Sequence, residues 1–232
     1  MKKYKLMVLP CMILSLLAWY TFHHTFSNAD LVYAKETQVT IVLDAGHGGY
    51  DSGGISAQGI YEKDITLSVA LQIGALLEDY GYEVIYTRDR DEVSSSEDNL
   101  EDLRERVNIA TMAQADLFLS IHTNSSENYD DGAFGIEAYY NGTDETMKQL
   151  GTQILNQLQA LGYSDLRGLK STADSSLYVI DQNNVSALLL ELGFLSDSED
   201  AAYLTSTLGQ QQMAQAIADA IHLQYGLSKS TS

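Results

Sequence analysis

The sequence predicts an α/β fold: a single domain built on a mostly parallel, twisted sheet with helices on both faces. Short runs of apolar and β-branched residues alternate with segments of helical periodicity, which is the pattern of βαβ units. Several of the short runs are apolar throughout, as expected for strands that are covered on both faces. The chain has 232 residues, 45% of them hydrophobic, which suffices for one sizeable core and some extra chain.

The expected strands follow one another in the order that this alternation gives. The runs TIVL at 40–43, LFLSI at 117–121 and ALLL at 187–190 lack a period of two, so we expect them to be central strands. The β-branched and aromatic content of two further runs favours strands there as well. Together the predicted strands are 39–43, 83–86, 116–121, 135–140 and 186–191.

Helices are predicted between these strands, where apolar residues recur at a spacing of three and four. They are expected at 65–79, 100–112, 146–161 and 210–224. No repeat, Gly/Ser linker or second composition regime interrupts the pattern. We therefore expect one domain at 35–228, followed by a short tail at 229–232.

Residues 1–34 are predicted to be a signal peptide or a signal anchor. Three lysines among the first five residues precede an apolar run at 6–22, the arrangement of an export signal. Cleavage and retention both stay open, because a run of this length is at the short limit for a membrane span and 32–34 offers a small-residue cleavage site. Cys11 lies within the run, and we interpret it as an apolar residue rather than a lipid attachment site. The prediction is an extracytoplasmic protein, secreted or anchored, that contacts the membrane only through an uncleaved segment.

The charge balance excludes binding to nucleic acid. Asp and Glu number 32 against 13 Lys and Arg, a formal net charge of −19, so the cationic surface that nucleic acid requires is missing. Without residues 1–34, which hold three lysines and one aspartate, the net charge is −21. The single cysteine lies in the N-terminal run, so the rest of the chain has no disulfide, thiolate nucleophile or cysteine metal ligand.

Three predicted strands end in groups that can bind a metal or move a proton. Asp44 and His47 follow the first, His122 ends the third, and Glu191 ends the last. Ligands of open α/β sheets bind beyond the carboxyl ends of the strands, so these side chains are expected to converge. A lone histidine is usually structural, but two at converging strand ends favour a functional site.

A glycine-rich loop follows the first strand. The stretch 44–54, DAGHGGYDSGG, holds five glycines, which let the backbone approach a ligand closely. It matches no phosphate-binding motif and has no lysine, so nucleotide binding is not favoured. Glu62 comes next, shortly before a predicted helix, where favourable interaction with the helix N-terminus is an ordinary explanation. However, two imidazoles and one carboxylate are the ligand set of a catalytic zinc site, and this favours His47, Glu62 and His122 as the metal ligands.

Glu191 is the candidate for proton transfer. Hydrolysis by a metal-activated water needs a carboxylate that takes up a proton and later returns it to the leaving group. Glu191 ends the apolar run ALLL and is followed by LGFL. A carboxylate in this context is costly to bury unless it is paired or functional.

These residues lie in motifs that resemble the zinc-dependent N-acetylmuramoyl-L-alanine amidases of the type-3 amidase family. The motifs are LDAGHGG, then Glu62, then DLFLSIHTN and LLLELGFLSD, joined by GYEVIYTR, RGLK and LYVI. They occur in the family's order and cover about 40–226. The resemblance implies that His47, Glu62 and His122 bind Zn²⁺ and that Glu191 is the general acid and base.

The resemblance also implies a substrate and a reaction. The family cleaves the amide bond between the lactyl group of N-acetylmuramic acid and the L-alanine that starts the stem peptide of peptidoglycan. We therefore expect a peptidoglycan hydrolase that acts in cell-wall remodelling or lysis. A zinc peptidase or carboxypeptidase acting within the stem peptide fits the same residues chemically. A non-catalytic wall-binding protein and an acidic structural protein are further alternatives.

Two features depart from the family pattern. Val185 and Ser186 stand where proline is common, and Asp197 stands where asparagine is common, which puts the local turn geometry in question. Between 140 and 186 we expect one helix and a loop, with no long helical insertion that would cover the site. The site is therefore predicted to be open, and no obligate protein partner is expected.

Four other residues have a functional and an ordinary interpretation. Asp44 could orient His47 or cap a turn, and Glu137 could line the substrate groove or be an exposed strand residue. Arg88 and Arg167 could meet stem-peptide carboxylates or pair with acidic residues of the protein.

Overall fold

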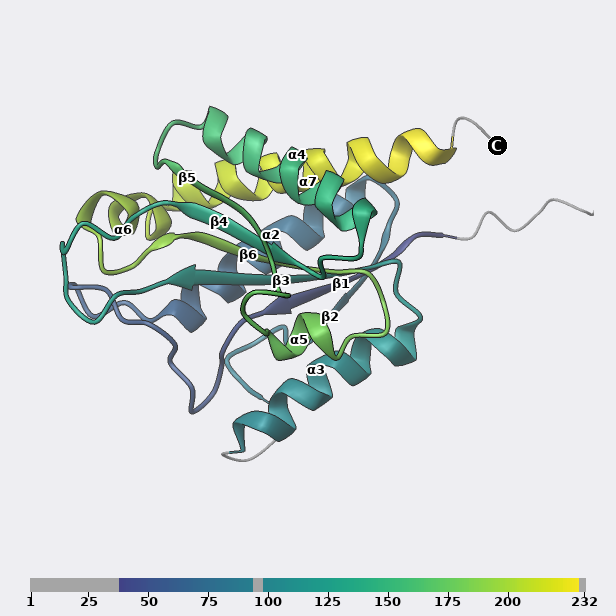
Figure 1. Ribbon diagram of the computed structural model, residues 1–232, viewed down its shortest axis with the longest axis horizontal. Coiled ribbons are helices and arrows are strands. Elements are labelled where there is room, and N and C mark those ends of the chain that lie inside the picture. The colour runs from purple at the N-terminus through teal and green to yellow at the C-terminus, as the bar shows by residue number, and fades with distance from the viewer. Residues whose placement is uncertain (1–37, 94–97, 230–232) are drawn as a thin grey trace, which may run out of the picture. The chain divides into compact units, whose positions relative to one another are not determined.

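The computed structural model of the protein describes residues 38–93 and 98–229 (Figure 1). The predicted signal segment at 1–34 lies outside the described residues. Within the described ranges, none of the helices combines the length and the apolar character that a membrane span requires.

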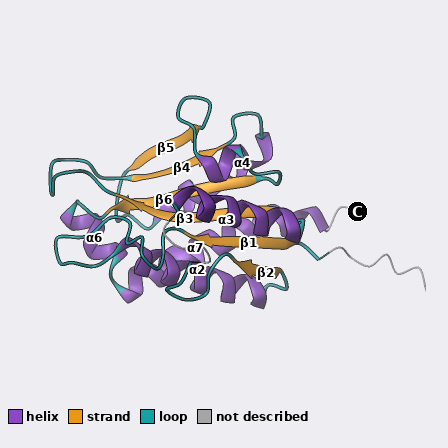
Figure 2. Cartoon of the chain, turned by 90° about the horizontal axis from the view of Figure 1, so that it is seen from below, coloured by secondary structure: helices purple, strands orange, loops and turns teal. Residues whose placement is uncertain are grey.

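Six strands form one mixed sheet in the order β2-β1-β3-β6-β4-β5, which Figure 2 shows from one face. All neighbours are parallel except β4 and β6, so β4 and β5 run opposite to the other four strands. The mostly parallel sheet is therefore confirmed, and all five predicted strands are present. The bounds are β1 (Thr40–Ala45), β2 (Glu83–Tyr86), β3 (Leu117–Asn124), β4 (Ile136–Tyr140), β5 (Leu166–Ser171) and β6 (Ala187–Phe194).

The prediction of one helix and a loop between 140 and 186 is wrong, because this segment also holds the strand β5 and a short helix. The sequence of β5, LRGLKS, is largely polar, and the strand lies at the edge of the sheet with its residues only partly buried. An edge strand is covered incompletely, so it lacks the apolar run by which the central strands were predicted.

Helices cover both faces of the sheet, as predicted. Figure 1 shows α4 and α7 on one side of the sheet, where α2 also packs, and α3 and α5 on the other. The short helices α5 and α6 were not predicted, since neither is long enough to show a helical period. The bounds are α2 (Glu62–Asp79), α3 (Asn99–Ala113), α4 (Glu145–Ala160), α5 (Tyr178–Asp181), α6 (Ser198–Leu204) and α7 (Thr207–Lys229).

The two departures from the family pattern have local explanations. Asp197 caps the N-terminus of α6, where its side chain accepts hydrogen bonds from the backbone N–H groups of Glu199 and Asp200 at 3.0 and 2.9 Å. Aspartate serves as well as asparagine in this role. The Ser186 hydroxyl donates to Asp144, the N-cap residue of α4, at 2.7 Å.

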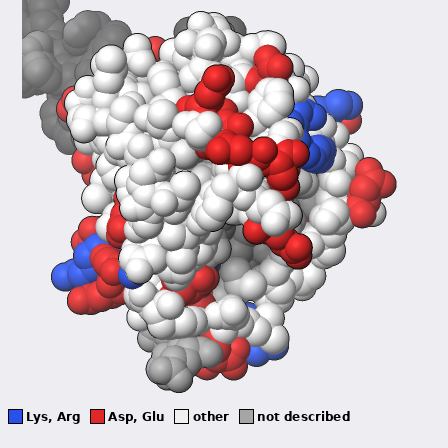
Figure 3. All heavy atoms as spheres, turned by 90° about the vertical axis from the view of Figure 1, so that its left-hand side faces the viewer, with Lys and Arg blue, Asp and Glu red and all other residues white. Residues whose placement is uncertain are grey.

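The carboxyl ends of β1, β3 and β6 lie at one end of the molecule. Figure 3 looks onto this end, and acidic side chains predominate over basic ones on the face that it shows. The excess of negative charge in the sequence therefore extends to the end where the predicted site residues lie.

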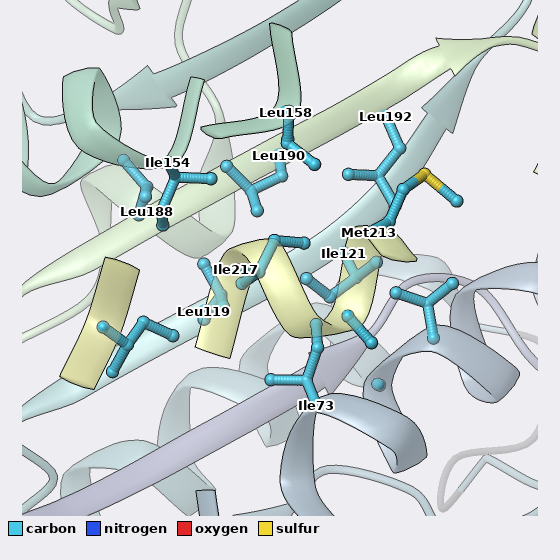
Figure 4. Close-up of a cluster of buried hydrophobic side chains, with 14 of the residues drawn as sticks. Ile73, Leu119, Ile121, Ile154, Leu158, Leu188, Leu190, Leu192, Met213 and Ile217 are labelled. Atoms are coloured by element: carbon cyan, nitrogen blue, oxygen red, sulfur yellow. The ribbon is translucent and has the colours of Figure 1, made fainter. Parts of the chain in front are cut away.

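The main core lies between the sheet and α2, α4 and α7. Alternate residues of the central strands point into it and pack against apolar side chains of the three helices (Figure 4). The strand residues of this set include Leu119, Ile121, Leu188, Leu190 and Leu192, and the helix residues include Ile73, Ile154, Leu158, Met213 and Ile217.

The intervening strand residues form a smaller core against α3 and α5. Val42, Phe118 and Leu189 are the strand residues at its centre. Towards the carboxyl ends of the same strands, the side chains on this face become polar: Asp44 on β1, Ser120 and His122 on β3, and Glu191 on β6. The strands thus carry a core at one end of this face and polar groups at the other.

Candidate functional site

His47 lies on the glycine-rich loop that follows β1. Its φ of 61° is in the left-handed region, which few residues other than glycine adopt. Its ring meets the ring of His122 edge to face, with centroids 4.9 Å apart. Gly46 makes this approach possible, because a Cβ at this position would lie 2.3 Å from the His122 ring.

Glu62 is the first residue of α2 and lies between the two histidines. Its Oε1 is 3.1 Å from His122 Nδ1, and its Oε2 is 3.2 Å from His47 Nε2. The backbone N–H groups of Gly54 and Thr123 donate to these oxygens at 2.8 and 2.9 Å. One ligand atom from each of His47, Glu62 and His122 lies within 4.8 Å of the others, so the three could hold a metal ion.

The electrostatics of this group favour positive charge between its members. Burial opposes ionisation of Glu62, but its hydrogen bonds to the two imidazoles lower its pKa well below the usual range. Burial also opposes the charged form of His47, yet Glu62 and Asp51 raise its pKa to about 9. The buried carboxylate therefore stabilises a cationic partner.

Asp51 fixes the orientation of the His47 ring and was not predicted. Its Oδ2 lies 2.7 Å from His47 Nδ1, so His47 Nε2 faces Glu62. It comes four residues after His47 in the glycine-rich loop, and this short spacing was the available signal. The prediction that Asp44 could hold His47 or cap a turn is wrong, since Asp44 is buried and accepts hydrogen bonds from Ser120, Thr87 and Arg106 at 2.6, 2.7 and 2.8 Å.

Two buried arginines hold the backbone of the loop. Arg88 donates to the carbonyl oxygens of Ala45, Gly46 and Lys63 at 2.9, 3.0 and 2.8 Å, so neither of the roles expected for it describes these contacts. Arg106, which was not predicted, donates to the His47 carbonyl at 2.7 Å while it pairs with Asp44. Asp44 thus acts on the loop through Arg106.

Glu191 lies beside the three clustered residues. It is the register partner of His122 in the parallel pair of β3 and β6. Its Oε2 is buried and has no hydrogen-bond partner among the described residues. Burial raises the pKa of Glu191 to about 7, and the nearby charges of Glu62 and Glu137 act in the same direction. Its carboxyl group can therefore bind and release a proton near neutral pH.

Glu137 faces Glu191 across the antiparallel pair of β4 and β6. It is not an exposed strand residue, because only 2% of its side chain is exposed. Its carboxylate accepts hydrogen bonds from four side chains: Asn124 at 3.1 Å, Tyr139 at 2.7 Å, Arg167 at 2.7 Å and Lys170 at 2.5 Å. Glu137 thus joins the site end of β4 to the edge strand β5, and Arg167 pairs with an acidic residue.

A cleft of about 280 Å³ adjoins the two histidines on the face that α3 and α5 cover. Polar residues of the site, including His47, Asp51 and His122, line one part of it. Leu103, Leu177 and Leu189 line another part.

Comparison with known proteins finds similarity to amidases in both sequence and structure. A family model described as N-acetylmuramoyl-L-alanine amidase matches residues 41–222. N-acetylmuramoyl-L-alanine amidase LytC of Bacillus subtilis (strain 168) is 38% identical over 183 residues, which is 78% of this chain and 34% of LytC. The chain therefore spans about a third of the length of that relative.

Solved structures share the fold. AmiC2 of Nostoc punctiforme, an N-acetylmuramoyl-L-alanine amidase, superposes with a TM-score of 0.71 at 33% identity, over 82% of this chain and 97% of the solved chain. The CwlD amidase from Clostridioides difficile, solved in complex with the GerS lipoprotein, gives a TM-score of 0.75 at 31% identity, over 82% of this chain and all of that one.

Proposed function

Because this chain belongs to the N-acetylmuramoyl-L-alanine amidase family, we propose that it hydrolyses the bond between the lactyl group of N-acetylmuramic acid and the L-alanine of the peptidoglycan stem, with one zinc ion and Glu191. The observation that supports this most directly is the cluster of His47, Glu62 and His122 beside the unpartnered carboxyl oxygen of Glu191.

The three clustered residues fit zinc in chemistry and spacing. Zinc takes nitrogen and oxygen ligands at about 2.0 to 2.2 Å, so neighbouring ligands of a tetrahedral ion lie roughly 3.3 Å apart. The two histidine nitrogens lie 3.2 and 3.1 Å from the oxygens of Glu62. Three protein ligands leave one position free, as in catalytic zinc sites. A bound zinc ion would supply a Lewis acid that polarises the amide carbonyl and lowers the pKa of water.

The protein groups around the ligands keep them in place. Asp51 holds the Nδ1 side of His47, and the N–H groups of Gly54 and Thr123 orient the carboxylate of Glu62. Hydrogen bonds of this kind fix the direction of ligand atoms and tune their basicity. Arg88 and Arg106 hold the carbonyl groups of the loop that carries His47.

Glu191 transfers the proton in this proposal. Its carboxylate takes a proton from the attacking water as the new C–O bond forms at the lactyl carbonyl. It returns the proton to the alanine nitrogen as the C–N bond breaks, which gives a free carboxylic acid and a free amine. A pKa of about 7 suits a group that must do both near neutral pH.

We further propose that residues 35–228 form the catalytic domain and that 1–34 direct export, so that the enzyme works outside the cytoplasm on peptidoglycan. The family match at 41–222 lies within the proposed domain. No obligate protein partner is proposed. Addition of a partner protein that strongly stimulates the enzyme would contradict this part.

The test is digestion of purified peptidoglycan, with and without a zinc chelator, and with Glu191→Ala alongside. We expect new L-alanine amino termini and intact lactyl-bearing glycans by mass spectrometry. Neither product should form in the presence of the chelator or with the variant. Added zinc should restore product formation only in the wild-type protein. New termini within the stem peptide would instead identify a peptidase. Absence of metal-dependent cleavage would contradict an enzyme of this mechanism.

A further inference from the structure

Two partly exposed cations lie at the site end of the sheet and share a single carboxylate. Arg167 Nε and Lys170 Nζ lie 2.7 and 2.5 Å from the same oxygen of Glu137. Glu137 is buried, whereas 40% of the Arg167 side chain and 39% of the Lys170 side chain are exposed. Two positive charges and one negative charge leave the cluster with one positive charge in excess, in a protein whose formal net charge is −19.

Arg167 and Lys170 differ from the two other arginines near the site, Arg88 and Arg106. Arg88 and Arg106 are buried, and their N–H groups are bonded to loop carbonyls and to carboxylates. Arg167 and Lys170 also lie over aromatic rings, 4.9 Å from the centroid of Phe194 and 5.5 Å from that of Tyr139, which limits where their side chains point. Their exposed sides are therefore available to an anionic ligand.

We propose that Arg167 and Lys170 bind a carboxylate of the stem peptide. The carboxylate is that of the second residue, a D-glutamate that is linked to the third residue through its γ-carboxyl group, so that its α-carboxylate is free. This inference rests on the proposed amidase function, and it assigns a substrate contact to residues outside the metal cluster. Because Glu137 anchors both cations, it positions them for this contact.

The distance between the two cations and Glu191 matches the second residue of the stem peptide. Glu137 is directly opposite Glu191 on the neighbouring strand, and strands lie about 4.8 Å apart, so cations bonded to Glu137 are roughly 5 to 10 Å from the catalytic carboxylate. An extended peptide advances about 3.4 Å per residue, which places the α-carboxylate of the second residue roughly 7 Å from the scissile bond. Carboxylates of later residues lie farther away.

The direction of the peptide follows from the same arrangement. The sheet order β3-β6-β4-β5 puts the metal cluster, Glu191, Glu137 and the two cations one after another across the sheet. A stem peptide that starts at the metal cluster and runs across β6 and β4 therefore meets Arg167 and Lys170 on its way. The excess of acidic groups elsewhere at this end would repel its carboxylate.

The experiment compares two soluble substrates: N-acetylmuramoyl-L-Ala-γ-D-Glu-L-Lys and the same molecule with the α-carboxylate of glutamate amidated. Kinetics are measured with the full chain, for wild type and for Lys170→Met, Arg167→Met and the charge-retaining Lys170→Arg. Lys148→Met is the control, because Lys148 is an exposed lysine on α4 that also pairs with one glutamate, at 3.2 Å.

We expect kcat/KM of the wild type to be about tenfold higher for the free carboxylate, since hydrogen bonds to charged groups are stronger than those to neutral ones. Lys170→Met and Arg167→Met should bring this ratio close to one. Lys170→Arg and Lys148→Met should keep it. The ratio would not respond to a merely structural change, which affects both substrates alike.

Equal wild-type rates on the two substrates would overturn the proposal, and so would an equal loss on both in Lys170→Met and Arg167→Met. A third substrate carries an amide in place of the C-terminal carboxylate of the third residue. If the loss of this carboxylate, and not that of glutamate, lowered kcat/KM, the proposal would also be overturned. Failure of the amidase function itself looks different, because wild type and Lys148→Met would then release no L-alanine amino terminus from either substrate, and the inference would fall with it.

Discussion

The two faces of the central strands have different compositions, and neighbouring residues of one strand show the contrast. Leu190 is fully buried in the main core against α4 and α7, while Glu191 points to the opposite face, beside His122. The same change occurs on β3 between Ile121 and His122. Because side chains alternate along a strand, one eight-residue segment serves a core on one face and a site on the other.

This difference shows that the residues for stability and the residues for chemistry lie on opposite faces of the same strands, not in different segments of the chain. The main core face is apolar from Leu117 to Ile121 on β3 and from Leu188 to Leu192 on β6, whereas the other face is apolar at one end and polar at the other. Substitutions on the main core face should therefore change the free energy of unfolding. Substitutions at the polar end should change the rate of catalysis or the affinity for metal.

Glu191→Gln should have the largest effect, a loss of catalysis without a loss of stability. Loss of a general acid and base lowers kcat by about 10² to 10⁴-fold. The protein should remain folded with its zinc affinity unchanged, because the carboxylate lies outside the proposed ligand set. The measurements are kcat on soluble muropeptides, zinc content and the unfolding midpoint. A fall in kcat of less than tenfold would remove Glu191 from the proposed mechanism.

Leu190→Ala should produce the opposite pattern. Truncation of a fully buried leucine costs about 2 to 5 kcal/mol, which lowers the unfolding midpoint by roughly 5 to 15 °C in a domain of this size. The kcat per folded molecule should stay close to that of wild type. Leu208→Ala is the matched control, because Leu208 is 64% exposed and its truncation should change little. A large loss of kcat in folded Leu190→Ala would show that the faces are coupled.

The free energy of unfolding should depend on pH through Glu191, on the polar face. Burial raises the pKa of Glu191 to about 7, whereas the unfolded value is 4.5. Between these values the folded state binds the extra proton, so stability falls as the pH rises through this window. In zinc-depleted protein, Glu191→Gln should therefore gain up to about 3 kcal/mol over wild type between pH 4.5 and 7. Denaturant titrations with parallel pH profiles for the two proteins would refute this.

The sequence predicted those parts of the molecule that depend on local pattern. The central strands begin as apolar runs, which His122 and Glu191 follow, so both the sheet and the convergence of the site residues followed from the sequence. The strands themselves continue past these two residues, to Asn124 and Phe194. The edge strand β5 could not be found in this way, because it is only partly buried and its residues are largely polar. The assignment of zinc ligands and of a catalytic carboxylate stays a prediction.

Contacts between residues far apart in the sequence explain what the pattern did not reveal. Asp44 and Arg106 are 62 positions apart, and Glu137 and Arg167 are 30 apart, so no local spacing indicates that they pair. Asp44 appeared suited to orient His47, but the pairing with Arg106 gives it another role. Asp51 was overlooked because a glycine-rich loop has no period from which the direction of a side chain can be inferred.

Asp51→Asn should have the smallest effect of these substitutions, and it refines the contrast between the faces. Asp51 touches no predicted zinc position directly, but it fixes the ring of His47 through Nδ1 at 2.7 Å. Loss of such a partner typically lowers metal affinity or activity by about 10 to 100-fold. We therefore expect weaker zinc binding in competition with a chelator, at an unfolding midpoint of the zinc-free protein that is close to wild type. Asp174→Asn, at an exposed aspartate of the loop after β5, should leave zinc affinity unchanged. Equal affinities for both variants would mean that the loop backbone, held by Arg88 and Arg106, suffices to orient His47.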